Sequence, residues 1–236
     1  MHEQHVRQTK DFAAQNSWQW LRRGSLKRQT ESLIIAAQDQ TLGTNYRKAK
    51  IEHSRESATC RMCKTRDETV THIISECSKL AQTDYKARHD RVASAVHWSI
   101  MKAHGLPHTK SWYDHRAGKV VENEDVKVLW DFNIQVDKFI QARRSDVIMA
   151  RKKKKECVPS DIRAQIKENE KIEKYENLKR EISKLWGVQT TVIPIIIGAL
   201  GTVTDRLTSF LAIVGVSLSF ETIQKSALLG SGHILE

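Results

Sequence analysis

Three cysteines and one histidine, in the spacing C-x2-C-x8-H-x4-C, constrain this chain more than any other feature. The four residues are Cys60, Cys63, His72 and Cys77. Two cysteines separated by two residues can bind one metal ion from a single tight turn, and a following histidine and cysteine can complete a tetrahedral shell. Thiolate and imidazole ligands in this pattern are typical of structural zinc. We therefore predict a zinc knuckle that binds a structural Zn²⁺ ion.

Other interpretations of this segment are weaker. Three reduced thiols and a surface histidine could occur together by chance, but chance rarely gives ligand spacing on both sides. His53 and His89 could each replace a ligand, although neither has a short spacing to a cysteine. The polar run at residues 64–68 suits a loop between ligand pairs, and few apolar residues surround it. Such a small unit has little core without its metal.

The chain is strongly basic, with a formal net charge of +11 and a pI of about 9.6 over 236 residues. Lysine and arginine side chains that neutralise phosphates release condensed counterions, which favours binding to polyanions. DNA or RNA is the predicted partner, and neither composition nor motif distinguishes between them. A basic excess can also be no more than a solvated surface. The predicted knuckle favours the nucleic-acid interpretation.

The cysteine spacing and the apolar pattern also predict a cellular setting. Reduced cysteines at metal-ligand spacing suit an intracellular compartment, and no secretory signal is recognised, so we expect a nuclear or cytoplasmic protein, with the nucleus favoured. The longest apolar stretch, residues 192–203, is interrupted by Pro194. It falls short of the roughly 20 residues that a membrane span needs. We expect a buried strand there and no membrane partner.

Hydrophobic periodicity outlines the remaining elements. Alternating strand and helix patterns predict an α/β core. The expected helices cover residues 25–40, 79–104, 161–186, 202–214 and 219–229, and the expected strands cover residues 143–150 and 190–200. The segment 124–140 is predicted as a strand or a short helix pair. The four lysines at residues 152–155 are predicted as a turn, and they suit a solvated hairpin tip, a nuclear-import patch or a phosphate contact.

The loop after the second helix places aromatic side chains among cations. Its members are Trp112, Tyr113, His115 and Arg116. Such a mixture can stack on nucleic-acid bases, and it can equally form an aromatic staple that packs under a long loop. The sequence leaves both interpretations open.

Eight short motifs together resemble one protein family. They lie at residues 30–33, 60–63, 72–81, 121–124, 130–132, 142–146, 173–175 and 198–201. In these motifs the chain is similar to the C-terminal region of non-LTR retrotransposon reverse transcriptases of the restriction-like-endonuclease type. The resemblance implies a helical connector at residues 1–50, a CCHC zinc knuckle with a basic helix at 51–105, and a PD-(D/E)xK-like endonuclease domain at 106–236. It also implies a retrotransposon polymerase as a possible partner, because this chain contains no polymerase domain.

The resemblance assigns roles to four residues of the nuclease-like part. In the family, carboxylates at adjacent strand ends bind Mg²⁺ while a lysine stabilises the charge that develops on the phosphate. Asp146 matches the first acid, with Ser145 where the family has proline. Lys171, Lys174 and Tyr175 match the downstream lysine and tyrosine positions.

The second acid departs from the family pattern. Family members carry it on a hydrophobic strand that precedes a Pro-Gly/Ser-Asp turn, whereas here Cys157 and Val158 run directly into the turn-like residues 159–161. The sequence therefore predicts a mixed sheet with flanking helices that lacks one core strand, and Asp161 as a misleading substitute for the lost acid. We expect a nucleic-acid-binding fragment with a degraded endonuclease domain. The alternative is an active endonuclease that uses Mg²⁺ to nick DNA for target-primed reverse transcription.

Overall fold

The computed structural model describes residues 14–135, 144–163 and 168–236 of the chain, with the side chains of residues 14, 15, 163 and 168–174 left out. The chain forms two compact units. The first contains the described residues before Val92 together with Ile197–Asp205 and Phe220–Glu236, and the second contains Val92–Ile196 and Arg206–Ser219. No helix in the described part is long and apolar enough to cross a bilayer.

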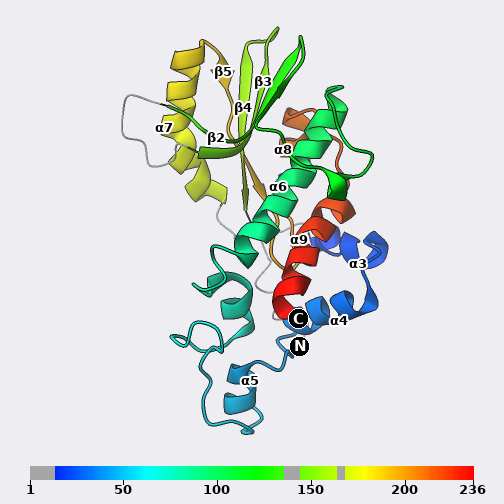
Figure 1. Ribbon diagram of the computed structural model, residues 1–236, viewed down its shortest axis with the longest axis vertical. Coiled ribbons are helices and arrows are strands. Elements are labelled where there is room, and N and C mark those ends of the chain that lie inside the picture. Colours follow the sequence, from blue (N-terminus) through cyan, green and yellow to red (C-terminus); the bar gives the residue numbers. More distant parts are fainter. Residues whose placement is uncertain (1–13, 136–143, 164–167) are drawn as a thin grey trace. The chain divides into compact units, whose positions relative to one another are not determined.

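A mixed β-sheet forms the centre of the second unit (Figure 1). Its strands are β1 (Val120–Glu122), β2 (Val126–Asn133), β3 (Arg144–Arg151), β4 (Glu156–Arg163), β5 (Gln189–Thr190) and β6 (Ile193–Ile196). The strands β1 to β4 form an antiparallel meander, whereas β5 and β6 both pair with β4 in parallel. The predicted lysine turn at residues 152–155 joins β3 to β4 and is confirmed.

The strand β4 overturns one prediction. Pro159, Ser160 and Asp161 were expected in a turn, and this is wrong: they lie inside an eight-residue strand whose register with β3 pairs Ile148 with Pro159. Proline lacks an N–H group and is normally excluded from central strands. Here β5 pairs with β4 up to Cys157 and β6 pairs from Ser160 onward. Pro159 therefore lies where β4 has no paired neighbour on that side.

Helix α7 (Glu168–Trp186) connects β4 to β5 and packs beside the sheet, as Figure 1 shows. Tyr175, Leu178 and Ile182 are buried, and they contact apolar side chains of the sheet. These three residues recur at helical spacing and form the buried face of the described part of α7. Leu185, which the periodicity places on the same face, is 49% exposed. Short helix α8 (Leu207–Ile213) packs against β6.

The first unit is mainly helical. Its helices are α2 (Ala14–Ser17), α3 (Gln19–Arg23), α4 (Arg28–Gln38), α5 (Asn45–Lys50), the π-helical turn η1 (His72–Glu76), the start of α6 (Asp84–Ala103), and α9 (Phe220–Leu235). Trp20, Ile34 and Leu228 form a buried cluster from α3, α4 and α9. The segment at residues 198–201 is tied to this core, because Gln38 donates to the Leu200 carbonyl at 2.9 Å and Gln224 to the Gly201 carbonyl at 2.6 Å.

Both α9 and residues 197–205 belong to the unit that contains the N-terminal helices, because their apolar side chains pack against Trp20 and Ile34. The predicted strand at residues 190–200 is shorter than expected and is divided into β5 and β6. The element types predicted for residues 25–40, 79–104 and 143–150 agree with the observed α4, α6 and β3. The helix predicted at residues 161–186 agrees with α7 from Glu168 onward, but its first residues, 161–163, lie in β4.

Candidate metal centre and neighbouring groups

A tight turn presents Cys60 and Cys63. The Lys64 N–H donates to the Cys60 carbonyl at 3.1 Å, and the Cys60 N–H donates to the Arg66 carbonyl at 2.8 Å. Lys64 has a positive φ of 59°, as a tight reversal of the chain requires. The Met62 N–H points at the Cys60 sulfur, 3.4 Å away. Local backbone bonding therefore turns both sulfur atoms toward the same side.

The other two residues of the cluster flank a single π-helical turn. His72 begins η1 and Cys77 follows it, and the Cys77 N–H donates to the His72 carbonyl at 2.9 Å. Helix α6 supports this turn. The hydroxyl of Tyr85 accepts the Cys77 N–H at 3.0 Å and donates to the Ile73 carbonyl at 2.6 Å, while Arg88 donates to the Ile74 carbonyl at 2.9 Å.

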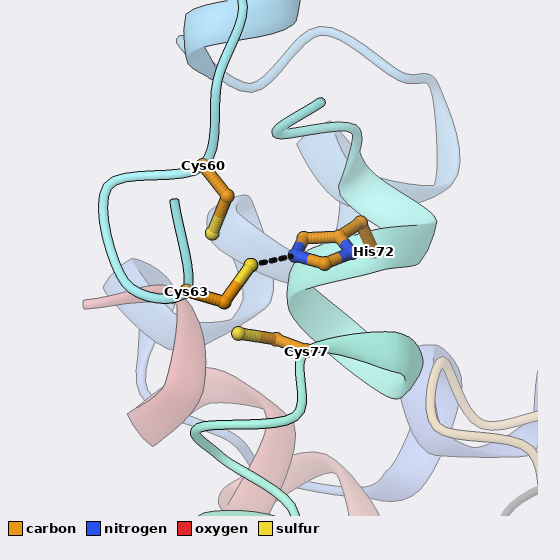
Figure 2. Close-up of side chains that lie close together, drawn as sticks. All are labelled: Cys60, Cys63, His72 and Cys77. Carbon is orange, nitrogen blue, oxygen red and sulfur yellow. Dashed lines mark hydrogen bonds between the residues drawn. The ribbon is translucent and has the colours of Figure 1, made fainter. Parts of the chain in front are cut away.

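The four side chains converge, as Figure 2 shows. Their ligand atoms lie within 4.8 Å of one another, and the Cys63 sulfur is 3.3 Å from the His72 Nε2 atom. Tetrahedral zinc with bonds of about 2.0 to 2.3 Å separates its ligand atoms by roughly 3.3 to 3.8 Å, so the observed cluster is close to that size. All four residues are buried. The donor set and its geometry fit a metal ion such as zinc.

The surroundings of the cysteines favour a bound cation. The Thr65 hydroxyl donates to the Cys63 sulfur at 3.2 Å, and this bond, together with backbone N–H groups, lowers the pKa of Cys63 to about 5. Burial instead raises the pKa of Cys77. A cysteine binds a metal ion as the thiolate, so the low pKa of Cys63 favours binding, and the charge of the ion would stabilise the thiolate of Cys77.

Glu68 connects the cysteine turn to helix α5 through hydrogen bonds. Its carboxylate accepts hydrogen bonds from the Arg61 N–H at 2.7 Å and from the Asn45 N–H at 2.9 Å. It also forms a bidentate pair with the Arg61 guanidinium. Burial alone would raise the pKa of Glu68, but these donors outweigh burial and lower it to about 2. Glu68 was not predicted as important, because an acid in a polar loop gives no sign of burial in the sequence.

A pocket of about 460 Å³ lies next to the cysteine turn. Arg61 and Met62 line one part of it, and Leu33 and Ile234 line another. Met62 is 49% exposed although it is apolar. Within the first unit, the metal-site loop therefore offers both a cation and an apolar side chain at an open surface.

The sheet brings two of the predicted nuclease residues to neighbouring strands. Asp146 on β3 and Asp161 on β4 are the next residues beyond the register pair Val147 with Ser160 at one end of the antiparallel pairing. The Asp146 carboxylate accepts the Ile162 N–H at 2.7 Å, and the Tyr175 hydroxyl donates to Asp161 at 3.0 Å. Asp161 is only 5% exposed. Three of the five predicted residues therefore lie in one region of the second unit.

The two predicted lysines cannot be placed in the same way. Lys171 and Lys174 belong to the first turns of α7, and their side chains lie outside the described residues. Within the described residues, the Cys60, Cys63, His72 and Cys77 cluster is the one group of three or more ligand side chains close enough to hold an ion.

Comparison with known proteins gives no family assignment: no protein-family model matches the chain, and no curated protein shows significant sequence similarity to it.

Proposed function

We propose that this chain is a nucleic-acid-binding fragment from the C-terminal region of a non-LTR retrotransposon reverse transcriptase, with a zinc knuckle at its metal centre. The observation that carries the proposal is the buried Cys60, Cys63, His72 and Cys77 cluster in a chain of net charge +11. A small metal-held loop with exposed cations is a common way to bind nucleic acid. The motif resemblance adds the family, and the nucleus is the expected location.

The charge around the metal site supports this proposal. The loop between the two ligand pairs carries Lys64 and Arg66 in exposed positions, and the Arg66 side chain is 69% exposed. Arg61, between the two cysteines, has a side chain that is 58% exposed. A metal ion would fix the positions of these cations relative to one another, so binding of a phosphate backbone would depend on the metal.

Fluorescence anisotropy with labelled single-stranded DNA, single-stranded RNA and duplex DNA tests the proposal. We expect binding whose affinity falls tenfold or more between about 50 mM and about 200 mM salt, because phosphate contacts release counterions. Cys63→Ser should lose much of this binding. Cys157→Ala is the matched control, because Cys157 is a buried cysteine of β4 outside the cluster. A zinc-loaded wild-type protein that binds none of the three probes would contradict the proposal.

A second candidate function is an Mg²⁺-dependent DNA-nicking endonuclease. The observation that favours it is that β4 carries Asp161 on the strand next to that of Asp146. Carboxylates on adjacent strands are a common arrangement for Mg²⁺. Asp161 then stands where the family's second acid would be, although it is buried and bonded to Tyr175. In that case the endonuclease domain would be active and not degraded, with Asp161 in the role of the second acid.

A supercoiled-plasmid nicking assay with Mg²⁺ or Mn²⁺ separates the two functions. Nicking that disappears in both Asp146→Ala and Asp161→Asn would establish the endonuclease. Binding of the plasmid without nicking would leave the binding function alone. Asp125→Asn is the matched control, because Asp125 is an exposed acid at the turn before β2.

A further inference from the structure

The segment after α6 is attached to that helix on both sides of its aromatic pair. On one side, the indole N–H of Trp98 donates to the Thr109 carbonyl at 2.9 Å. On the other side, the Ser94 hydroxyl donates to the His115 carbonyl at 3.2 Å, and the His115 ring bonds to the buried His97 ring at 2.7 Å. The backbone between these attachments is therefore held in place by α6.

The attached segment carries an aromatic ring in solvent. Trp112 and Tyr113 begin the short 3-10 helix η2 (Trp112–Asp114), and their rings meet edge to face with centroids 5.8 Å apart. Tyr113 is 71% exposed, the highest value among the large apolar and aromatic side chains identified as exposed in the described residues. The staple interpretation is therefore wrong for Tyr113, because its ring is not packed under the loop.

Cations flank the exposed ring in the sequence. Lys110 precedes the pair, while Arg116 and Lys119 follow it, and all three are exposed. Asp114 is the one acid among residues 107–119. An aromatic face with flanking cations fits a strand whose bases are unpaired, since bases stack on the ring and phosphates meet the cations. In duplex DNA the base faces are already stacked, so the duplex fits this surface poorly.

We propose that Tyr113, supported by Trp112, is a stacking site for an unpaired base of single-stranded nucleic acid, with Lys110 and Arg116 contacting the adjacent phosphates. This inference rests on the proposed nucleic-acid binding and adds a contact in the second unit. The attachments to α6 fix the backbone that carries Tyr113. The protein therefore loses little conformational freedom when a base stacks on the ring.

The test uses a labelled single strand of about 15 nucleotides, a length within the usual site sizes of single-strand binders. We expect Tyr113→Ala to weaken its binding roughly tenfold or more, because stacking on one base contributes that much. Tyr113→Phe should stay within about threefold of wild type, since it keeps the ring face. Trp186→Ala, which removes a half-exposed aromatic ring at the end of α7, is the matched control and should bind normally.

A strand containing 2-aminopurine supplies a second measurement. Stacking on Tyr113 should quench its fluorescence in wild type and in Tyr113→Phe, but not in Tyr113→Ala. Wild-type binding that Tyr113→Ala leaves unchanged would overturn the stacking site alone. An equal loss for single strand and duplex, or an equal loss in Trp186→Ala, would also overturn it. Failure of wild type to bind any nucleic acid would overturn the proposed function, and the stacking site with it.

Discussion

The guanidinium of Arg61 forms two hydrogen bonds to the fully buried carboxylate of Glu68, at 3.0 and 2.6 Å. Arg61 lies between Cys60 and Cys63, so this pair fixes the turn that carries half of the metal cluster. Asn45 on α5 donates to the same carboxylate from its backbone and its side chain. The metal site thus depends on a buried acid that is not a ligand.

Glu68→Ala should weaken zinc binding roughly 10- to 100-fold, as loss of outer partners of metal ligands does in other proteins. The variant removes the bidentate partner of Arg61 and leaves the buried Asn45 N–H without its acceptor, and an unsatisfied buried donor is costly. Competition with a coloured zinc chelator measures the change. Glu52→Ala is the control, because the Arg47–Glu52 ion pair is partly exposed and contributes little. Equal zinc affinity in Glu68→Ala and wild type would show that the carboxylate does not position the turn.

Gly201→Ala should destabilise the protein by roughly 2 to 3 kcal/mol, whereas Gly187→Ala should cost only about 1 kcal/mol. Both glycines have positive φ, of 89° and 60°. A Cβ atom on Gly201 would lie 3.0 Å from the Trp20 indole, while one on Gly187 would meet nothing within 4 Å. Chemical denaturation of the two variants gives the comparison. Similar losses of unfolding free energy in both variants would mean that the Trp20 indole does not restrict the size of the side chain at position 201.

Acidification should destabilise the second unit through His97. Burial, followed by the neighbouring His115, lowers the pKa of His97 to about 4. In the unfolded chain this histidine takes up a proton near pH 6.5. The contribution of neutral His97 to the free energy of unfolding is therefore fully present above that pH. It is lost as the pH falls toward 4, by about 3 kcal/mol at most. The unfolding free energy of His97→Gln should therefore change less between pH 6.5 and pH 4 than that of wild type. If the unfolding free energies of wild type and His97→Gln changed equally with pH, His97 would not be the source of the acid sensitivity.

The metal cluster could be predicted from sequence because its geometry is local. Two residues between cysteines allow one tight turn, and four residues between His72 and Cys77 span about one helical turn. Spacing alone therefore brings each pair of ligands together. The supporting Glu68, Tyr85 and Arg88 could not be found in this way, because their importance comes from burial against other segments.

The strand β4 could not be predicted, and the reason is also physical. Its residues Pro159, Ser160 and Asp161 have the local preferences of a turn. Pairing with β3 on one side and with β5 and β6 on the other outweighs those preferences. The pairing with β5 and β6 depends on segments about 30 residues away in the chain, so the local sequence pattern contains little information about it. The pairing with β3 also places Asp161 on the strand next to that of Asp146.

The zinc content of the purified protein tests the central claim most directly. Elemental analysis should find one zinc per wild-type chain, because the buried cluster provides four ligands for a single tetrahedral ion. Cys63→Ser should lose most of the zinc, whereas Cys157→Ala should retain it, since the Cys157 thiol lies outside the cluster and burial raises its pKa to about 12. A folded wild-type chain without bound zinc in zinc-containing buffer, or equal zinc content in wild type and Cys63→Ser, would contradict the account.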